Sequence, residues 1–323
     1  MVVRYELTGT ALADVRFAVS PLNELVLSLR SRRDPGRYPL HLPWVRRTRA
    51  AFEQLDTEVL EALVSPRNWV PDFLTPQPLS PLTRFDEELA RLSATPAATV
   101  RQDLLATYGT TDRIPGVLRG REAVRRIAGA LDDYWRRCFA PDWPRVRAVL
   151  EADVTYRGRQ MAQHGLAAMF AGLTDRVRLD GGVLEVRTGS GSRWSGRAEQ
   201  AMTLVPTLWT SAVCVPVSPD GLSTVLYLAR GSATVWESAP PPADGALAGV
   251  LGAHRAALLQ RLEAPASSTE LAHGMGVTPT AVNQHLRALR AAGLLVAVRD
   301  GRSVLYRRSD LAEALLSSAV SPL

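Results

Sequence analysis

Hydrophobic and polar positions near the carboxyl end of the chain predict two helices joined by a tight turn. The first begins at Ser267 or Ser268, whose hydroxyl groups can cap a helix N-terminus, with Glu270 in its first turn. Gly276 can adopt the left-handed backbone that ends it. The second begins at Thr278-Pro279, a hydroxyl cap followed by proline. Its apolar side chains recur at the helical period and share one face, which consists of Val282, Leu286 and Leu289.

A basic β-hairpin is predicted after the second helix. Residues 294–299 and 303–308 are rich in β-forming side chains, and Asp300-Gly301 between them fits a two-residue turn that matches strand twist. Residues 278–308 contain six arginines and one acid, a net charge of +5 within a chain that carries +6 in total. Positive charge is therefore concentrated where a phosphate backbone could dock.

The face of the second helix opposite its apolar stripe carries amide, hydroxyl and guanidinium groups. Amides can pair with adenine, and arginines can pair with guanine or with phosphate. A histidine on this helix is expected to pack or to contact phosphate rather than to bind a metal. The residues predicted to contact DNA are Thr278, Thr280, Asn283, Gln284, His285, Arg287, Arg290, Arg299, Arg302 and Arg307.

Residues 247–318 resemble the ArsR-type winged helix-turn-helix family of bacterial transcription regulators. The resemblance implies a homodimer bound to double-stranded DNA, with the second helix in the major groove and the hairpin, or wing, along the adjacent backbone or minor groove. It also implies a dimer contact on helices at about 247–262 and 310–316. Asn283 stands where many relatives have serine. The motifs that carry the resemblance are Glu270-Leu-Ala, Gly276-Val-Thr-Pro, Val282-Asn-Gln-His-Leu286, Leu289, Ala292-Gly-Leu294 and Asp300-Gly-Arg-Ser-Val-Leu-Tyr306.

The cysteine content departs from the metal-sensing members of that family. Those members bind thiophilic ions through clusters of cysteine and histidine, because soft thiolates and imidazoles favour such ions. This chain has two cysteines, Cys138 and Cys214, which are far apart in sequence and have no paired cysteine or histidine nearby. We therefore expect no metal site and no other cofactor.

The residues before the predicted DNA-binding region indicate an α+β fold. Apolar spacing predicts single helices at about 44–63 and 143–173, and two-residue alternation predicts strands from about residue 175. The expected divisions are an N-terminal regulatory or effector domain at 1–237, helical to about 173 and formed of antiparallel strands over about 175–237, a proline-rich linker at 238–245, and the winged helix-turn-helix at 246–323.

This N-terminal part is similar to the long leader domain of some actinobacterial ArsR-type regulators, a region without an assigned activity. The similar features are the strands around Tyr5 and Phe17, the proline-rich passage at 71–76 and the closing strands. They transfer no functional residues, so the ligand-binding residues stay unknown at this level.

The amino-acid composition indicates in which cellular compartment the protein is expected. All 38 basic residues are arginine, which GC-rich coding explains. Two cysteines fit a reducing compartment. Residues 1–7 lack a signal pattern, and no apolar run approaches the roughly 20 residues that a membrane span requires. We expect a cytoplasmic protein without membrane association.

These features together predict a sequence-specific DNA-binding transcription regulator, a repressor rather than an activator, whose N-terminal domain senses an organic ligand or a protein partner. One alternative is a winged helix used for protein–protein interaction. Another is an enzyme with a fused DNA-binding tail, but its candidate residues fall in no nucleophile, metal or phosphate pattern, so we expect no enzymatic activity and no catalytic residues. Those candidates are His41, His164, Asp132, Asp133, Asp142 and Glu151.

Overall fold

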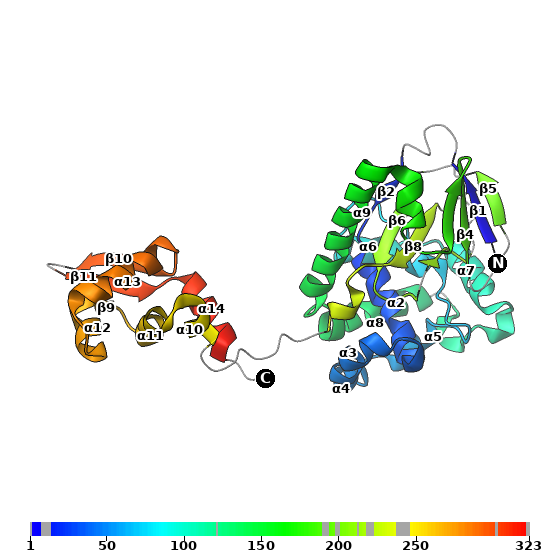
Figure 1. The fold of residues 1–323 in the computed structure, drawn as a ribbon. Helices are drawn as coiled ribbons and strands as arrows, with labels where there is room; N and C mark the ends of the chain where they lie inside the picture. Colours follow the sequence, from blue (N-terminus) through cyan, green and yellow to red (C-terminus); the bar gives the residue numbers. More distant parts are fainter. Residues whose placement is uncertain are drawn as a thin grey trace. The chain divides into compact units, whose positions relative to one another are not determined.

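The computed structural model divides the chain into two compact units, Met1–Glu237 and Ser238–Leu323. Figure 1 shows them in sequence colours, and each unit is described by itself. The residues that the structure describes are 2–7, 14–120, 122–188, 194–197, 201–211, 213–217, 223–236, 246–300 and 303–320.

The first unit combines helices with short strands, in accordance with the predicted α+β class. Its helices are α2 (Pro21–Arg33), α3 (Leu42–Arg47), α4 (Arg49–Phe52), α5 (Thr57–Ala62), α6 (Phe85–Ser93), α7 (Ala97–Tyr108), α8 (Ala123–Tyr134) and α9 (Trp143–Ala171). Its strands are β1 (Val2–Glu6), β2 (Arg16–Phe17), β3 (Val177–Asp180), β4 (Val183–Arg187), β5 (Trp194–Arg197), β6 (Thr203–Thr207), β7 (Val213–Cys214) and β8 (Thr224–Leu228).

Among the described residues, the strands of the first unit form two sheets, in the orders β3-β4-β1-β5 and β2-β6-β8-β7. The pairing of β3 with β4 is antiparallel, as predicted. In the second sheet the prediction of antiparallel strands is confirmed for β7 and β8 but is wrong for β6, which is parallel to both β2 and β8. All of β6 and nearly all of β8 are buried. Strands covered on both faces are typical of parallel pairing, whereas a half-exposed antiparallel ribbon shows alternation.

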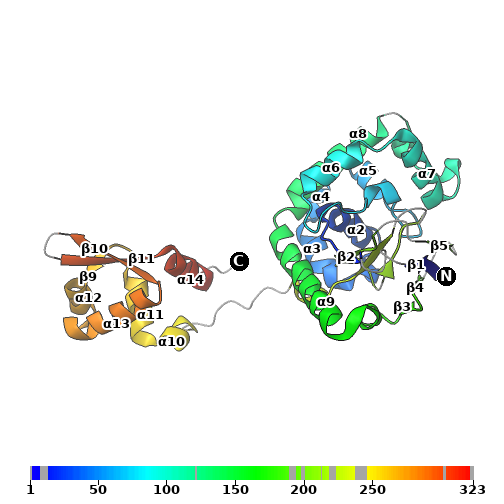
Figure 2. The same ribbon diagram turned by 90° about the horizontal axis from the view of Figure 1, so that it is seen from above.

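Helix α2 forms the centre of the first unit. Ser20 caps it by accepting a hydrogen bond from the Asn23 N–H at 3.0 Å, and the Ser20 hydroxyl in turn donates to Glu88 of α6 at 2.9 Å. Every residue of α2 as far as Ser31 is buried, so the helix is covered on all sides. In Figure 2, α9 borders one side of the unit and α6, α7 and α8 border the opposite side, with α2 between them.

The single helix expected at 44–63 is three short ones, α3, α4 and α5. The first break is at Thr48, whose hydroxyl donates to the Trp44 carbonyl at 2.8 Å. The second break lies before Asp56, whose carboxylate caps α5 by accepting from the Val59 N–H at 3.3 Å and also binds Arg126 at 2.6 Å. Apolar period alone could not locate these breaks, because side-chain hydrogen bonds with partners near and far in sequence set them.

Helix α9 also departs from the uninterrupted helix that was expected. Gly165 interrupts it with φ 82° and ψ 170°, a backbone conformation that side-chain-bearing residues rarely adopt. Beyond this break, Met169 and Phe170 are fully buried in the core that the two sheets share with the end of α9. The glycine therefore allows the last turn to redirect its apolar side chains toward the sheets.

The second unit contains five helices and a small sheet of order β10-β11-β9 among its described residues. The helix expected over 247–262 is broken at Gly252, with φ 86°. Within the described ranges, no helix of either unit combines the length and the apolar character needed to cross a membrane. The elements of the second unit are α10 (Ala246–Leu251), α11 (Ala253–Arg261), β9 (Ala266–Ser267), α12 (Ser268–Met275), α13 (Pro279–Ala291), β10 (Leu295–Asp300), β11 (Ser303–Arg308) and α14 (Asp310–Val320).

A carboxyl group lies in the middle of the first unit's core. Glu24 on α2 is 1% exposed, and its Oε2 atom accepts a hydrogen bond from the Leu208 N–H at 3.2 Å. Burial raises the pKa of Glu24 to about 8, so the folded chain holds this proton at neutral pH. In the unfolded chain the same group ionises near its ordinary value of 4.5.

We expect the Glu24 proton to make the first unit less stable as pH rises from about 4.5 to about 8, because the unfolded chain releases the proton before the folded chain does. The slope is at most about 1.4 kcal/mol per pH unit. Glu24→Gln removes this dependence, so its melting temperature relative to the parent rises across that window. All seven tryptophans lie before residue 238, so tryptophan fluorescence follows this unit alone. The same difference in melting temperature between Glu24→Gln and the parent at pH 4.5 and at pH 8 would contradict the prediction.

Candidate nucleic-acid interface

Helices α12 and α13 and the turn between them are set by side-chain caps. Ser267 and Glu270 form a reciprocal capping box, in which the Ser267 N–H donates to the Glu270 carboxylate at 2.7 Å and the Glu270 N–H donates to the Ser267 hydroxyl at 3.3 Å. Gly276 ends α12 in the left-handed region, with φ 66°. The hydroxyl of Thr278 then caps α13 by accepting from the Ala281 N–H at 3.3 Å. The Thr278 hydroxyl thus stabilises the N-terminus of α13.

One face of α13 is buried in the core of the second unit. Val282, Leu286 and Leu289 are each no more than 1% exposed and pack in the same cluster as residues from α11, α12, β10 and α14. These contacts determine which way α13 is turned about its axis. The side chains on its other faces are consequently held at the surface by the apolar contacts rather than by contacts of their own.

The polar face of α13 is accessible to solvent. Thr280, Gln284, Arg287 and Arg290 are exposed, and Asn283 is half-buried on its shoulder. Within the described part of the second unit, neither arginine takes part in an ion pair. Two amides, a hydroxyl and two unpaired guanidinium groups therefore line one helical surface. Such groups can donate to base edges and to phosphate oxygens.

The structure places His285 apart from this surface. Its ring is half-buried and stacks on His254 of α11, with 5.5 Å between ring centroids and 5° between planes. The Nδ1 atom of His285 is buried without a hydrogen-bond partner. His285 therefore contributes to the contact between α11 and α13, and its exposure is intermediate, as is that of Asn283. Arg302, at the predicted tip of the wing, lies outside the described residues.

The hairpin strands β10 and β11 pair antiparallel, and Arg299 and Arg307 are exposed on them. Arg299 is opposite Val304, and Arg307 is opposite Val296, so strand alternation puts the two arginines on opposite faces of the hairpin. Arg299 shares its face with the buried Leu295. The two arginines therefore approach a partner from different faces of the wing.

Arg308 has a structural role that counting charges did not reveal. Its guanidinium donates to the carbonyls of Leu259 at 2.7 Å and Gln260 at 2.6 Å, at the end of α11, and lies 3.5 Å from Glu313. The side chain is only 12% exposed. Arg308 belongs to the same hairpin face as the half-buried Tyr306, and this parity is the sequence signal that could have identified it.

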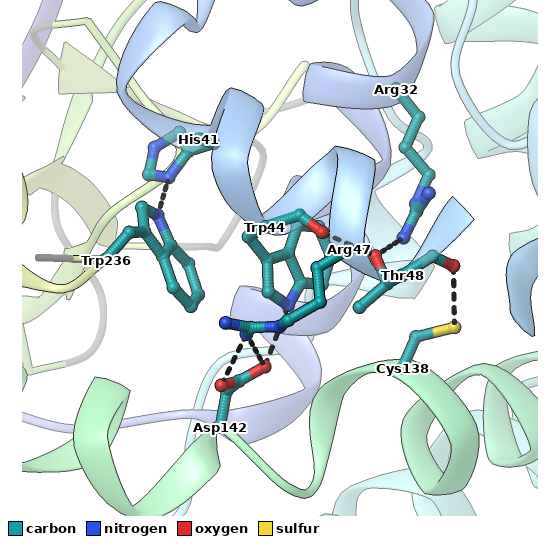
Figure 3. A network of polar contacts seen from close by, with 8 residues as sticks. All are labelled: Arg32, His41, Trp44, Arg47, Thr48, Cys138, Asp142 and Trp236. Atoms are coloured by element: carbon teal, nitrogen blue, oxygen red, sulfur yellow. Dashed lines mark hydrogen bonds and ion pairs between the residues drawn. The ribbon is translucent and has the colours of Figure 1, made fainter. Parts of the chain in front are cut away.

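Two candidates for catalysis, His41 and Asp142, belong to a polar network that holds the first unit together (Figure 3). The Trp236 indole N–H donates to His41 Nδ1 at 2.8 Å, and His41 Nε2 lies 2.9 Å from a backbone carbonyl. Burial lowers the pKa of His41 to about 4, so the ring is neutral. Asp142 accepts from the indole of Trp44 at 3.1 Å and from Arg47 at 2.7 Å. Both groups are occupied by structural partners.

The remaining candidates lie on the surface of helices α8 and α9. Asp132 forms an ion pair with Arg136 one turn later, and Glu151 pairs with Arg147. Asp133 and His164 are exposed. In the described ranges, no group of three His, Cys, Asp or Glu side chains is arranged to hold a metal ion.

Comparison with known proteins agrees with this geometry. Residues 253–299 match the family model of a helix-turn-helix domain, and residues 1–112 match a family of unknown function, DUF5937. Over 79 residues the chain is 40% identical to the HTH-type transcriptional repressor SmtB of Mycobacterium tuberculosis, in strains CDC 1551 / Oshkosh and ATCC 25618 / H37Rv. The match covers 22% of this chain and 58% of each relative, so it spans little more than half of their length. No solved structure matches.

The chain therefore carries a C-terminal helix-turn-helix domain of the ArsR type, similar to SmtB, after an N-terminal domain that matches a family of unknown function. The resemblance on residues 247–318 is confirmed in this form. The matched segment begins with α11 and includes the whole of α12, the turn and α13.

Arg308→Ala is expected to destabilise the second unit, because it leaves two carbonyls at the end of α11 without their charged donor. Hydrogen bonds to charged groups contribute about 1.5–3 kcal/mol each, so a loss of roughly 2 kcal/mol or more is expected. Calorimetry should show a lower melting transition for this unit while tryptophan fluorescence, confined to the first unit, stays unchanged. Arg307→Ala, the exposed neighbour, is the matched control. Equal transitions for both variants would show that Arg308 lacks this role.

Proposed function

We propose that this chain is a cytoplasmic, homodimeric transcription regulator that binds specific double-stranded DNA sequences through α13 and represses transcription, with the first unit as its effector-sensing part. The observation that carries the proposal is that α13 has one buried apolar face and one exposed polar face. Three buried apolar side chains on one side hold Thr280, Gln284 and Arg287 at the surface on the other. The similarity to proteins described as transcriptional repressors supports the direction of regulation.

The polar groups of α13 divide into two roles. Gln284 and Asn283 carry amides, which can read the donor and acceptor pattern of a base edge, adenine in particular. Arg287 and Arg290 carry charges that can also neutralise phosphates, whatever the sequence. Among the wing residues, Arg299 projects from the face that the hairpin turns toward its own unit, and we place it beside the phosphates that flank the groove.

The roles of Arg287 and Gln284 can be separated by titrating duplex DNA selected from a random library. Affinity of the parent should fall steeply as salt rises, since each phosphate contact releases counterions. Arg287→Ala should weaken selected and scrambled duplexes alike and lower the salt slope by about one. Gln284→Ala should mainly reduce the preference for the selected duplex, by about tenfold, the magnitude of one lost base contact. Fluorescence anisotropy at several salt concentrations measures each quantity.

Arg101→Ala is the matched control for this titration. Arg101 is exposed on α7 of the first unit, so the variant loses the same charge without touching the proposed surface. If all the variants bind as the parent does, or if affinity is independent of salt, the second unit is a protein-interaction module instead.

Apolar side chains on α10 and α14 support self-association. Val250 on α10 is 84% exposed, and Leu311 on α14 is 58% exposed. Both helices pack other side chains, among them Leu247 and Leu315, against the core of the second unit. A second copy of the chain would cover the apolar groups that this unit leaves in solvent, as the resemblance to dimeric regulators implies.

Leu311→Glu and Val250→Glu are expected to shift the chain from dimer to monomer, because each places a charge in the proposed apolar contact. Light scattering coupled to size exclusion measures the mass directly. Val298→Glu is the control, since Val298 is 55% exposed on the hairpin and lies outside this contact. A parent chain that is monomeric, or variants that stay dimeric, would contradict the proposed contact.

A further inference from the structure

The first unit contains a cavity of about 350 Å³. It lies where the carboxyl-terminal half of α2, the turn at 65–70 and the strands β7 and β8 meet. Pockets that hold small organic ligands begin at about this volume. The residues that face it are unusual in charge, because four arginines and one aspartate line the cavity, a net charge of +3.

The decisive side chain is Arg30 on α2. It is only 8% exposed, and its Nη1 atom lies 3.5 Å from the Cys214 thiol, while its Nε atom is buried without any hydrogen-bond partner. Within the described residues Arg30 takes part in no ion pair, so this buried cation lines the cavity without a paired carboxylate. Burying a charge without a counter-charge is costly, and an anionic ligand would supply the missing partner.

A second buried polar group faces the same space. Asn68 has φ 63°, the sole positive value among the described residues other than glycine. Its Nδ2 donates to the Tyr38 hydroxyl at 3.0 Å, and its Oδ1 is buried without a partner. The Tyr38 hydroxyl accepts this bond and keeps its own proton, because burial raises the pKa of Tyr38. The unpartnered Oδ1 atom beside this phenol is an acceptor that a donor group of a ligand could satisfy.

The other residues that line the cavity indicate which uncharged part of a ligand would fit there. Arg67 holds its guanidinium 5.2 Å above the ring of Trp69, and both line the cavity. Leu27, Val70 and Leu226 contribute apolar wall. The Asp72 carboxylate, which follows the turn, accepts from the Val217 N–H at 2.8 Å and so ties the segment after β7 to this part of the chain. The cavity is thus lined by guanidinium groups, an indole ring and aliphatic side chains.

We propose that this cavity binds an organic carboxylate with a flat, apolar body, whose carboxylate pairs with Arg30 and whose body packs against Trp69 and the aliphatic wall. The arginines at 37, 67 and 176 draw such anions toward the entrance through their positive potential. This inference gives a ligand class to the effector-sensing role proposed for the first unit. Its test, binding in the absence of DNA, is independent of whether the second unit binds DNA.

The test is calorimetric titration of the full chain with 4-hydroxybenzoate and with indole-3-acetate. Each carboxylate should bind at one site per chain, and 4-hydroxybenzamide and indole-3-acetamide should bind at least about tenfold more weakly, because they lack the charge that pairs with arginine. Inorganic phosphate is the third arm. Phosphate that binds as tightly as the carboxylates would show an inorganic anion site and overturn the apolar part of the proposal.

Variants identify the cavity as the site of binding. Arg30→Met keeps the length of a buried side chain and should weaken the carboxylates about tenfold or more. Asn68→Gly should fold normally, since glycine adopts the positive φ without strain, yet it should weaken the same ligands several-fold. Arg33→Gln, an exposed position on the same helix, is the matched control and should bind as the parent does.

The outcomes are distinct. No binding by either carboxylate, equal binding of the amides, or parent-like binding by both Arg30→Met and Asn68→Gly overturns the proposal. If Arg30→Met fails to fold, Asn68→Gly and Tyr38→Phe decide the matter. Carboxylate binding that persists in a chain unable to bind DNA would leave this inference intact and contradict the proposed function alone.

Discussion

The burial of one face of α13 is the constraint on which the proposed interface depends. Val282, Leu286 and Leu289 are almost completely removed from solvent, and each buried aliphatic side chain contributes about 1.5–3 kcal/mol. Turning the helix by a single residue would expose these groups, at a cost comparable with the net stability of a domain. Gln284 and Arg287 therefore owe their outward position to the opposite side of the helix. Specificity and stability reside in different residues of one element.

Arginine, the sole basic side chain apart from histidine, has three physical states in this chain. Arg287 is exposed and unpaired, which suits a group that meets a phosphate polymer. Arg308 is nearly buried and satisfied by backbone carbonyls at a helix end. Arg30 is buried and lacks an acidic partner among the described residues. A net charge counted from the sequence treats these three arginines alike, because it takes no account of how buried each side chain is or of what it contacts.

The first unit uses its polar core for architecture. His41 is fixed as a neutral ring between a carbonyl and Trp236, the last described residue before the linker region, so the end of this unit is tied to its interior. Asp142 likewise accepts hydrogen bonds within the unit, and the Glu24 carboxyl accepts one from the Leu208 N–H. Titratable residues are candidates for catalysis when only the sequence is known. Their hydrogen-bond partners and burial in the folded chain distinguish a structural group from a reactive one.

The amino-acid order was sufficient for α12, the turn and α13, because their caps, the turn glycine and the apolar period all act within a few residues of one another. It was also sufficient for the hairpin strands, whose turn residues and β-formers are local signals. Sequence patterns did not predict the features that depend on contacts between distant segments. These are the parallel pairing of β6 with β2 and β8, the break of the predicted helix at Asp56, and the contact of Arg308 with the end of α11. The cavity around Arg30 is the extreme case, since its walls come from α2, the turn at 65–70 and strands more than a hundred residues later. Short-range capping and periodicity can be recognised in a string of letters, whereas burial and long-range partners exist only once the chain has folded.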